Sequence, residues 1–202
     1  MKTINKTRLL LCSLLLIACG GPPDISECDT IGENLLAEFQ NHPAAWFNEN
    51  YTCANLTNAN LQGINLAGSF NANNSANFTD ADLSGANLTY VSAGRTVFIR
   101  TNLSRANLSW SVFQYANFTD ANLSGANLTS TYTAYAYMQG TNLQGANLTN
   151  AVMRNVNLNQ ANLRGANLEG ADLTNANLRN ADLRGANLIG VIGANTTSAI
   201  LY

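Results

Sequence analysis

The sequence has little charge and few of the side chains on which enzymes depend. Of its 202 residues, 11% are charged and only one, His42, is a histidine. One imidazole cannot build a serine–histidine–aspartate arrangement or a histidine-rich metal site. The glycines recur at the ends of short repeated units and form no phosphate-binding loop. We therefore expect no enzymatic activity, no metal and no cofactor.

The shortage of charge also limits the choice of partners. A formal net charge of -2 argues against a general attraction to nucleic acid or to anionic lipid. Average proteins carry about 25% charged residues, so Asn, Thr, Ser and Gly must supply most of the polar surface here. Asp80 and Asp82 form a close carboxylate pair. Such a pair at adjacent outward positions is more often solvated than catalytic.

The apolar run near the N-terminus is too short to cross a bilayer. Residues 9–18 form this run after three basic residues, whereas a membrane-spanning helix needs about 20 apolar residues. A basic start followed by a short apolar run is typical of a secretory signal peptide. The run ends in LIAC, residues 16–19, which resembles a bacterial lipobox. This resemblance implies removal of residues 1–18 and acylation of Cys19; an ordinary signal peptide is the alternative.

An acylated Cys19 would place the protein in the cell envelope. A multiply acylated cysteine anchors a protein stably, because two or more chains suffice where one is marginal. Gly20 after the cysteine would be compatible with the outer membrane in a Gram-negative host. Export would leave Cys28 and Cys53 as an even pair in a compartment where disulfides persist. We expect a disulfide between them, with two separate thiols as the alternative.

Residues 19–53 are predicted to form a membrane-proximal linker and a small helical cap. Leu35, Leu36 and Phe39 fit one face of a short helix, and Pro43 suits the first turn of another. The segment holds six acidic residues and neither Lys nor Arg. We interpret it as a solvated cap that covers the end of the domain that follows. The alternative is an acidic docking surface.

The rest of the chain repeats a five-residue unit. After an opening run that starts at Leu56 and a two-residue slip near residues 70–75, central residues recur every five positions from Phe78 to Leu188. Nearly every centre is Leu, Phe or Met, with a small residue two positions before it and usually Asn or Asp immediately before it. A unit of five residues cannot bury its own apolar side chain. The units must therefore stack to make a continuous core.

This A-(N/D)-L-x-x pattern resembles the pentapeptide-repeat family over residues 54–192. The resemblance implies an all-β solenoid, a right-handed quadrilateral β-helix with one unit on each side and four units in each coil. The centre and the small residue would face inward. At about 4.8 Å per layer, six to seven coils would make a column roughly 30 Å long. Residues 193–202 would form a C-terminal cap, or an end-to-end contact as in some family members, which leaves a homodimer open.

Residues 20 apart would stack on one another in the predicted coil. On this basis, departures from the repeat gather on one side of it. Apolar or aromatic residues there replace the usual polar coat. A compact exposed apolar patch often marks an interaction surface, and Tyr and Trp suit a protein or a sugar ring. The alternatives are aromatic ladders that only stabilise the coils, or a face covered by the N-terminal segment. The candidate face comprises Tyr90, Arg95, Trp110, Val112, Tyr115, Tyr132, Tyr135 and Val152.

Some pentapeptide-repeat proteins protect type II topoisomerases by imitating duplex DNA. DNA carries one negative charge per about 1.7 Å, so a roughly 30 Å mimic would need about 18 charges. The repeat region has six acidic residues against seven arginines, which makes this the remote alternative. Two hypotheses remain. One is a lipid-anchored module that binds an envelope protein or glycan through its aromatic face; the other is a structural envelope rod without a discrete ligand.

Overall fold

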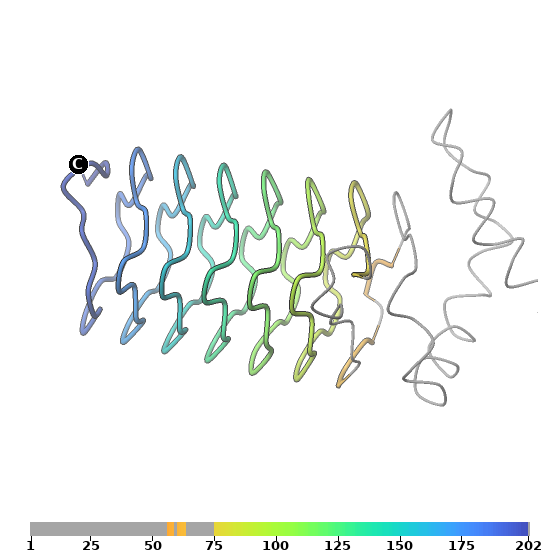
Figure 1. The fold of residues 1–202 in the computed structure, drawn as a ribbon. Coiled ribbons are helices and arrows are strands. Elements are labelled where there is room, and N and C mark those ends of the chain that lie inside the picture. Colours follow the sequence, from red (N-terminus) through yellow and green to blue (C-terminus); the bar gives the residue numbers. More distant parts are fainter. Residues whose placement is uncertain (1–55, 59, 64–74, 202) are drawn as a thin grey trace, which may run out of the picture.

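The computed structural model describes residues 56–58, 60–63 and 75–201, which wind into a stack of coils (Figure 1). The described residues contain no helix and no continuous strand. Isolated parallel β-bridges instead join residues that are 20 apart, such as Asn102 with Asn122 and Asn122 with Asn142. A coil is therefore four five-residue units. The predicted signal peptide, the helical cap and the Cys28–Cys53 disulfide lie outside the described residues.

Each unit has the same local conformation, which explains the period of five. In the unit around Asn122, the small Ala121 and the central Leu123 are buried, while Asn122 faces outward and forms the bridge. The fourth and fifth residues form a turn, and the fifth has a φ of 53° to 70° throughout the stack. This left-handed conformation turns the chain at each corner. The predicted inward orientation of the centre and the small residue is confirmed along residues 76–183.

Backbone hydrogen bonds join the coils without help from the outward side chains. The Leu123 N–H donates to the Asn142 carbonyl of the next coil at 2.7 Å, and the Asn122 N–H donates to the Thr101 carbonyl of the previous coil at 2.9 Å. This pattern recurs on all four sides. Because the ladder already satisfies these backbone groups, the outward position can change while the fold remains.

The four sides of the stack are named here, in chain order, by their central residues. Side A is opposite side C, and side B is opposite side D. Side A carries Ala93, Phe113, Thr133, Met153 and Leu173. Side B carries Phe78, Phe98, Phe118, Met138, Leu158 and Leu178. Side C carries Leu83, Leu103, Leu123, Leu143, Leu163 and Leu183. Side D carries Leu88, Leu108, Leu128, Leu148, Leu168 and Leu188.

An aromatic cluster fills the core between sides A and B. Phe98 and Phe118 stack with ring centroids 4.8 Å apart, and Phe113 approaches both rings edge-on at 6.0 and 5.4 Å. Phe113 has this room because its neighbours along side A, Ala93 and Thr133, are smaller and fully buried. The outer surface of sides A and B therefore rests on a tightly packed interior.

The first described coil is longer than those that follow. Asn60 pairs with Asn87, and the Asn87 amide donates to the Asn60 side-chain oxygen across this interval of 27 residues. From Asn77 onward the interval is 20, so the seven additional residues (27 − 20) fall between Gly63 and Ser75. Seven residues are one whole unit plus two, which accounts for the two-residue slip in the sequence.

The last coil is shorter than the others. Asp182 pairs with Ile200, whereas a full coil would bring residue 202 to that place. The Ile200 N–H donates to the Ala181 carbonyl at 2.8 Å, and the Leu183 N–H donates to the Ile200 carbonyl at 2.8 Å. Residues 199–201 thus repeat the small–outward–central arrangement, with Ala199 and Leu201 packed against the core. The C-terminal segment continues the stack on side C.

Candidate binding face

Exposed apolar side chains gather on side A and the positions next to it. The described residues include ten large exposed hydrophobic side chains. Three of them, Ile189, Ile192 and Ile200, belong to the C-terminal end, where Ile192 occupies the side A bridge position after Asp172. The other seven define the aromatic face, together with the half-buried Arg95 and Val152 of the predicted set. These seven, which are 37% to 60% exposed, are Tyr90, Trp110, Val112, Tyr115, Tyr132, Tyr135 and Tyr137.

The corner between sides A and B carries a continuous column of rings. The Arg95 guanidinium lies 5.0 Å from the centroid of the Tyr115 ring, and the rings of Tyr115 and Tyr135 stack at 5.1 Å with an interplanar angle of 19°. The column predicted from the 20-residue interval is therefore confirmed. Cation–π and ring-stacking contacts at exposed positions contribute about 0.5–1.5 kcal/mol each. These contacts favour the stacked arrangement of the two tyrosine rings.

The corner between sides D and A carries Tyr90 and, one coil later, Trp110. Both are left-handed, with φ of 59° and 62°, as are Tyr115 and Tyr135 at the other corner. A left-handed conformation costs an L-residue about 1–2 kcal/mol, and a bulky residue adopts it rarely. Glycine, as at Gly125, meets the same requirement without strain. The chain thus places four large rings at positions that smaller residues would occupy more cheaply.

An apolar column runs between these corners along the middle of side A. Val112, Tyr132 and Val152 occupy successive bridge positions. The column ends at Asp172, whose carboxylate accepts hydrogen bonds from Thr174 Oγ1 and from Arg154 Nε, both at 2.5 Å. The Thr174 hydrogen bonds, and then the Arg154 guanidinium, lower the pKa of Asp172. A paired charge therefore forms the margin of the face.

Tyr137 belongs to this surface and was missed by the sequence analysis. It occupies the outward position of side B, in the column that also contains Asn117 and Asn157, and its side chain is 53% exposed. The predicted columns lay on side A and its corners only. The same 20-residue comparison on side B would have found a tyrosine where asparagine is usual.

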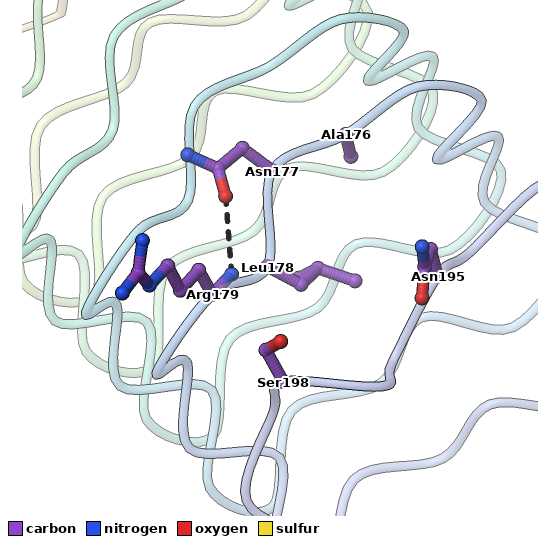
Figure 2. A pocket seen from close by; sticks show the side chains of 6 residues that line it. All are labelled: Ala176, Asn177, Leu178, Arg179, Asn195 and Ser198. Atoms are coloured by element: carbon purple, nitrogen blue, oxygen red, sulfur yellow. Dashed lines mark hydrogen bonds between the residues drawn. The ribbon is translucent and has the colours of Figure 1, made fainter.

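Two cavities of the described part lie away from this face. Figure 2 shows one of about 120 Å³ near the C-terminal end, where Asn195 and Ser198 face Ala176, Leu178 and Arg179. The Asn177 side-chain oxygen at its rim accepts the Arg179 N–H at 3.2 Å. The other cavity is a shallow groove on side C. Neither includes a residue of the aromatic face.

Nothing in the described ranges indicates a metal centre or a membrane span. They contain no group of three or more His, Cys, Asp or Glu side chains placed to hold a metal ion. No helix among them is long and apolar enough to cross a membrane.

The repeats can be assigned to a family. The family model described as pentapeptide repeats matches eight copies, at residues 76–114, 94–130, 134–170 and 157–192, which together span more than half of the chain. The chain belongs to the pentapeptide-repeat family. The resemblance to this family implied a quadrilateral β-helix, and the four-unit coils of the described residues agree with that architecture.

Several solved pentapeptide-repeat proteins are similar to this one. HetL, involved in heterocyst differentiation regulation in the cyanobacterium Nostoc sp. strain PCC 7120, is 27% identical over 75% of this chain and 76% of that chain, with a TM-score of 0.49. QnrB1, a plasmid-mediated fluoroquinolone resistance protein, is 18% identical over 77% and 79%, with a TM-score of 0.41. A pentapeptide-repeat protein of the Arabidopsis thaliana thylakoid lumen is 28% identical over 58% and 81%, with a TM-score of 0.26. No curated protein matches the chain significantly.

Proposed function

We propose that this pentapeptide-repeat protein is a non-enzymatic interaction module of the bacterial cell envelope. It is exported, anchored through acylated Cys19, and makes contact through the aromatic face. In a Gram-negative host it would occupy the outer membrane or its periplasmic face. The observation that carries this proposal is that eight of the ten large exposed apolar side chains of the described residues lie on side A and next to it, seven of them in the aromatic face.

The size of the aromatic face supports a contact role. At about 200 Å² per aromatic side chain, the exposed fractions of its six rings amount to roughly 600 Å². This equals the upper limit of the largest patch on a typical monomer, about 300–600 Å². It approaches the roughly 800 Å² that each partner buries in a standard protein interface. The enrichment in Tyr and Trp is typical of interface centres.

The anchor is tested by metabolic lipid labelling and membrane fractionation of the natural protein and Cys19→Ala. We expect both the label and the membrane location to depend on Cys19. A natural protein that stays unlabelled in the cytoplasm would overturn the envelope assignment. A count of free thiols on the unreduced mature protein tests the Cys28–Cys53 disulfide, for which we expect none.

The contact role is tested by changing Tyr115, Tyr132 and Tyr135 together to Asn. We expect this variant to lose binding to purified envelope fractions while its circular dichroism remains that of the natural protein. A matched control carries Ser104→Asn, Ser124→Asn and Gln144→Asn on side C and keeps binding. Equal binding by both variants would show that the aromatic face is not the site.

A structural rod without a discrete ligand is the second candidate, favoured by the C-terminal end. Ile189, Ile192 and Ile200 are all exposed there, and such an end suits assembly through the termini, including an end-to-end homodimer. Under this hypothesis, Ile189→Asn with Ile192→Asn would lower the assembly mass in light scattering. The aromatic-face variant would assemble normally.

Imitation of DNA is the remote third candidate. The six acidic residues of the repeats are opposed by seven arginines. Three of these acids are also in ion pairs: Asp80 with Arg100, Asp172 with Arg154, and Asp182 with Arg184. The surface therefore lacks the continuous negative charge of a duplex, and we expect no nucleic-acid-like role.

A further inference from the structure

The two corners of side A carry complementary series of residues. Along the chain, both corners advance by one residue per coil, so each residue of one corner has a counterpart at the same level on the other. The corner between sides D and A carries Tyr90, Trp110, Ser130 and Asn150. The corner between sides A and B carries Arg95, Tyr115, Tyr135 and Asn155.

We propose that the partner of the aromatic face is a second copy of this chain. The two solenoids lie side by side and parallel, with side A against side A, around a twofold axis parallel to the coil stack. This inference rests on the proposed function, because it names the occupant of the same face. A twofold interface uses one patch twice, so residue i meets residue j wherever j meets i.

Such an axis brings each corner of side A onto the opposite corner of the second copy, at the level of the same coil. Tyr90 then faces the second copy's Arg95, which suits a cation–π contact. Trp110 faces Tyr115, and two rings meet. Ser130 faces Tyr135, so a short side chain lies opposite a long one. Every large side chain of the corners therefore lies opposite a ring, a guanidinium or the short side chain of Ser130.

The middle column lies on the axis, so each of its residues meets its own copy. Val112, Tyr132 and Val152 would form an apolar seam along three consecutive coils. The Arg154–Asp172 ion pair lies at one end of that seam and Ser92 at the other. An apolar centre bounded by polar side chains is the usual organisation of a protein interface.

Area and direction favour this arrangement. The five rings on side A and its corners expose roughly 470 Å² on each copy. Two such faces would bury about 950 Å² before Val112, Val152 and Arg95 are counted, which approaches the lower limit of a standard interface. The described chain enters at one end of the stack and its C-terminus lies at the other (Figure 1). In a parallel pair, both N-terminal sides point the same way, which lets two lipid anchors enter one membrane. An antiparallel pair would point them in opposite directions.

The test is oxidative cross-linking of the full-length protein in membranes. Val112→Cys places a thiol on the proposed axis, and Asn122→Cys places one in the same coil on the opposite side. We expect a disulfide-linked dimer from Val112→Cys, and from Asn122→Cys only the background that the protein's own cysteines give. In an antiparallel pair centred on the seam, Val112 would lie against Val152, so self-linking of Val112→Cys also reports direction.

A second measurement is sedimentation equilibrium of the detergent-solubilised protein. Changing Tyr115, Tyr132 and Tyr135 to Asn should weaken dimerisation by about 100-fold or more, as expected when several central aromatic contacts are lost. The side C control variant should dimerise like the natural protein. A natural protein that is monomeric throughout, with no Val112→Cys dimer above background, would overturn the proposal.

These outcomes separate the dimer from the broader function. A monomer that still binds envelope fractions through the aromatic face removes the second copy as partner and leaves the interaction module intact. A monomer whose envelope binding ignores the face removes both. Equal cross-linking at Val112→Cys and Asn122→Cys would indicate non-specific collision and also contradict the dimer.

Discussion

Sides A and C are built on the same backbone and present opposite surfaces. On side C, each amide of Asn102, Asn122, Asn142 and Asn162 donates to the residue 20 positions earlier, at 3.1 to 3.3 Å. The same side-chain oxygens accept the backbone N–H two residues further along the chain, as Asn122 does from Ser124 at 3.2 Å. The outward residues of side C thus form hydrogen bonds both to the preceding coil and within their own turn.

Side A lacks these hydrogen bonds from Val112 to Val152, whereas Asp172 after them still accepts the Thr174 N–H at 3.0 Å. Valine and tyrosine at its outward positions have no oxygen that could accept in the same way. Within the part of the chain that the structure describes, the backbone N–H groups of Gln114, Ala134 and Arg154 accordingly receive no hydrogen-bond partner. The ladder and the core nevertheless continue unchanged behind them. The interior and the ladder therefore maintain the fold on both sides, and the proposed contact role of side A would explain why its outward residues differ from those of side C.

The largest effect should come from the shared interior. Phe98→Ala removes a ring that stacks on Phe118, and it should lower the free energy of unfolding by about 3–5 kcal/mol. Tyr90→Asn on the aromatic face should change it by no more than about 1 kcal/mol, because the Tyr90 side chain is 60% exposed and Asn adopts the left-handed conformation more readily. Urea unfolding followed by circular dichroism measures both. Equal losses would break the distinction between interior and surface.

A smaller loss is expected on side C. Asn122→Val removes the hydrogen bond that the Asn122 side-chain amide donates to Asn102. It also leaves the Ser124 N–H and the Asn142 side-chain amide without their acceptor. The free energy of unfolding should fall by about 1–2 kcal/mol. The same urea titration measures it, and an unchanged midpoint would show that the asparagine ladder contributes nothing to stability.

The reciprocal change in the same coil should cost less. Val112→Asn introduces an oxygen that can accept the Gln114 N–H, as side C does at Ser124. This gain opposes the lost apolar contact, so unfolding should shift by less than about 1 kcal/mol, while dimerisation weakens in sedimentation equilibrium. A loss larger than that of Asn122→Val would mean that side A contributes more to stability than side C.

The smallest effect should appear in acid. A hydrogen bond from Arg184 lowers the pKa of Asp182 from 3.8 to about 2. A carboxylate whose pKa is depressed by folding contributes stability above its unfolded pKa and loses it as the pH falls towards the folded value. The urea midpoint should therefore hold from pH 7 to about 5 and decline between about pH 4 and 2. Arg184→Gln should flatten part of that decline, and an identical acid profile would show that the pair does not contribute.

The regular part of this fold could be predicted from the sequence because each unit repeats one solution. The period of five followed from counting. The inward position of residues such as Leu123, and the 20-residue interval that predicts the column of Arg95, Tyr115 and Tyr135, followed from the resemblance to the pentapeptide-repeat family. Tyr137 was missed because only one side was compared. The longer interval at Asn60 could not be derived, since counting gives the phase of the repeat and not the number of whole units in a coil.

The return of the small–outward–central pattern at residues 199–201 could not be predicted by counting either. The shortened last coil breaks the period of five, and only pairing with the preceding coil shows that Ile200 belongs to side C. The strain at Tyr90 and Trp110 was equally hidden, because the sequence contains no direct signal of φ. These irregular positions depend on contacts between coils, which a repeat pattern within one chain segment does not describe.

Because a coil contains four units, the number of repeats between two positions determines how far one is rotated around the stack relative to the other. Gain or loss of one five-residue unit would turn every later side by a quarter turn relative to every earlier one, with the core and the ladder still satisfied. A change of four units would lengthen or shorten the column and leave its faces aligned. The direction in which the aromatic face points, relative to whatever precedes Leu56, is thus set by arithmetic on whole units, and variants that differ by one unit would face different neighbours with the same surface.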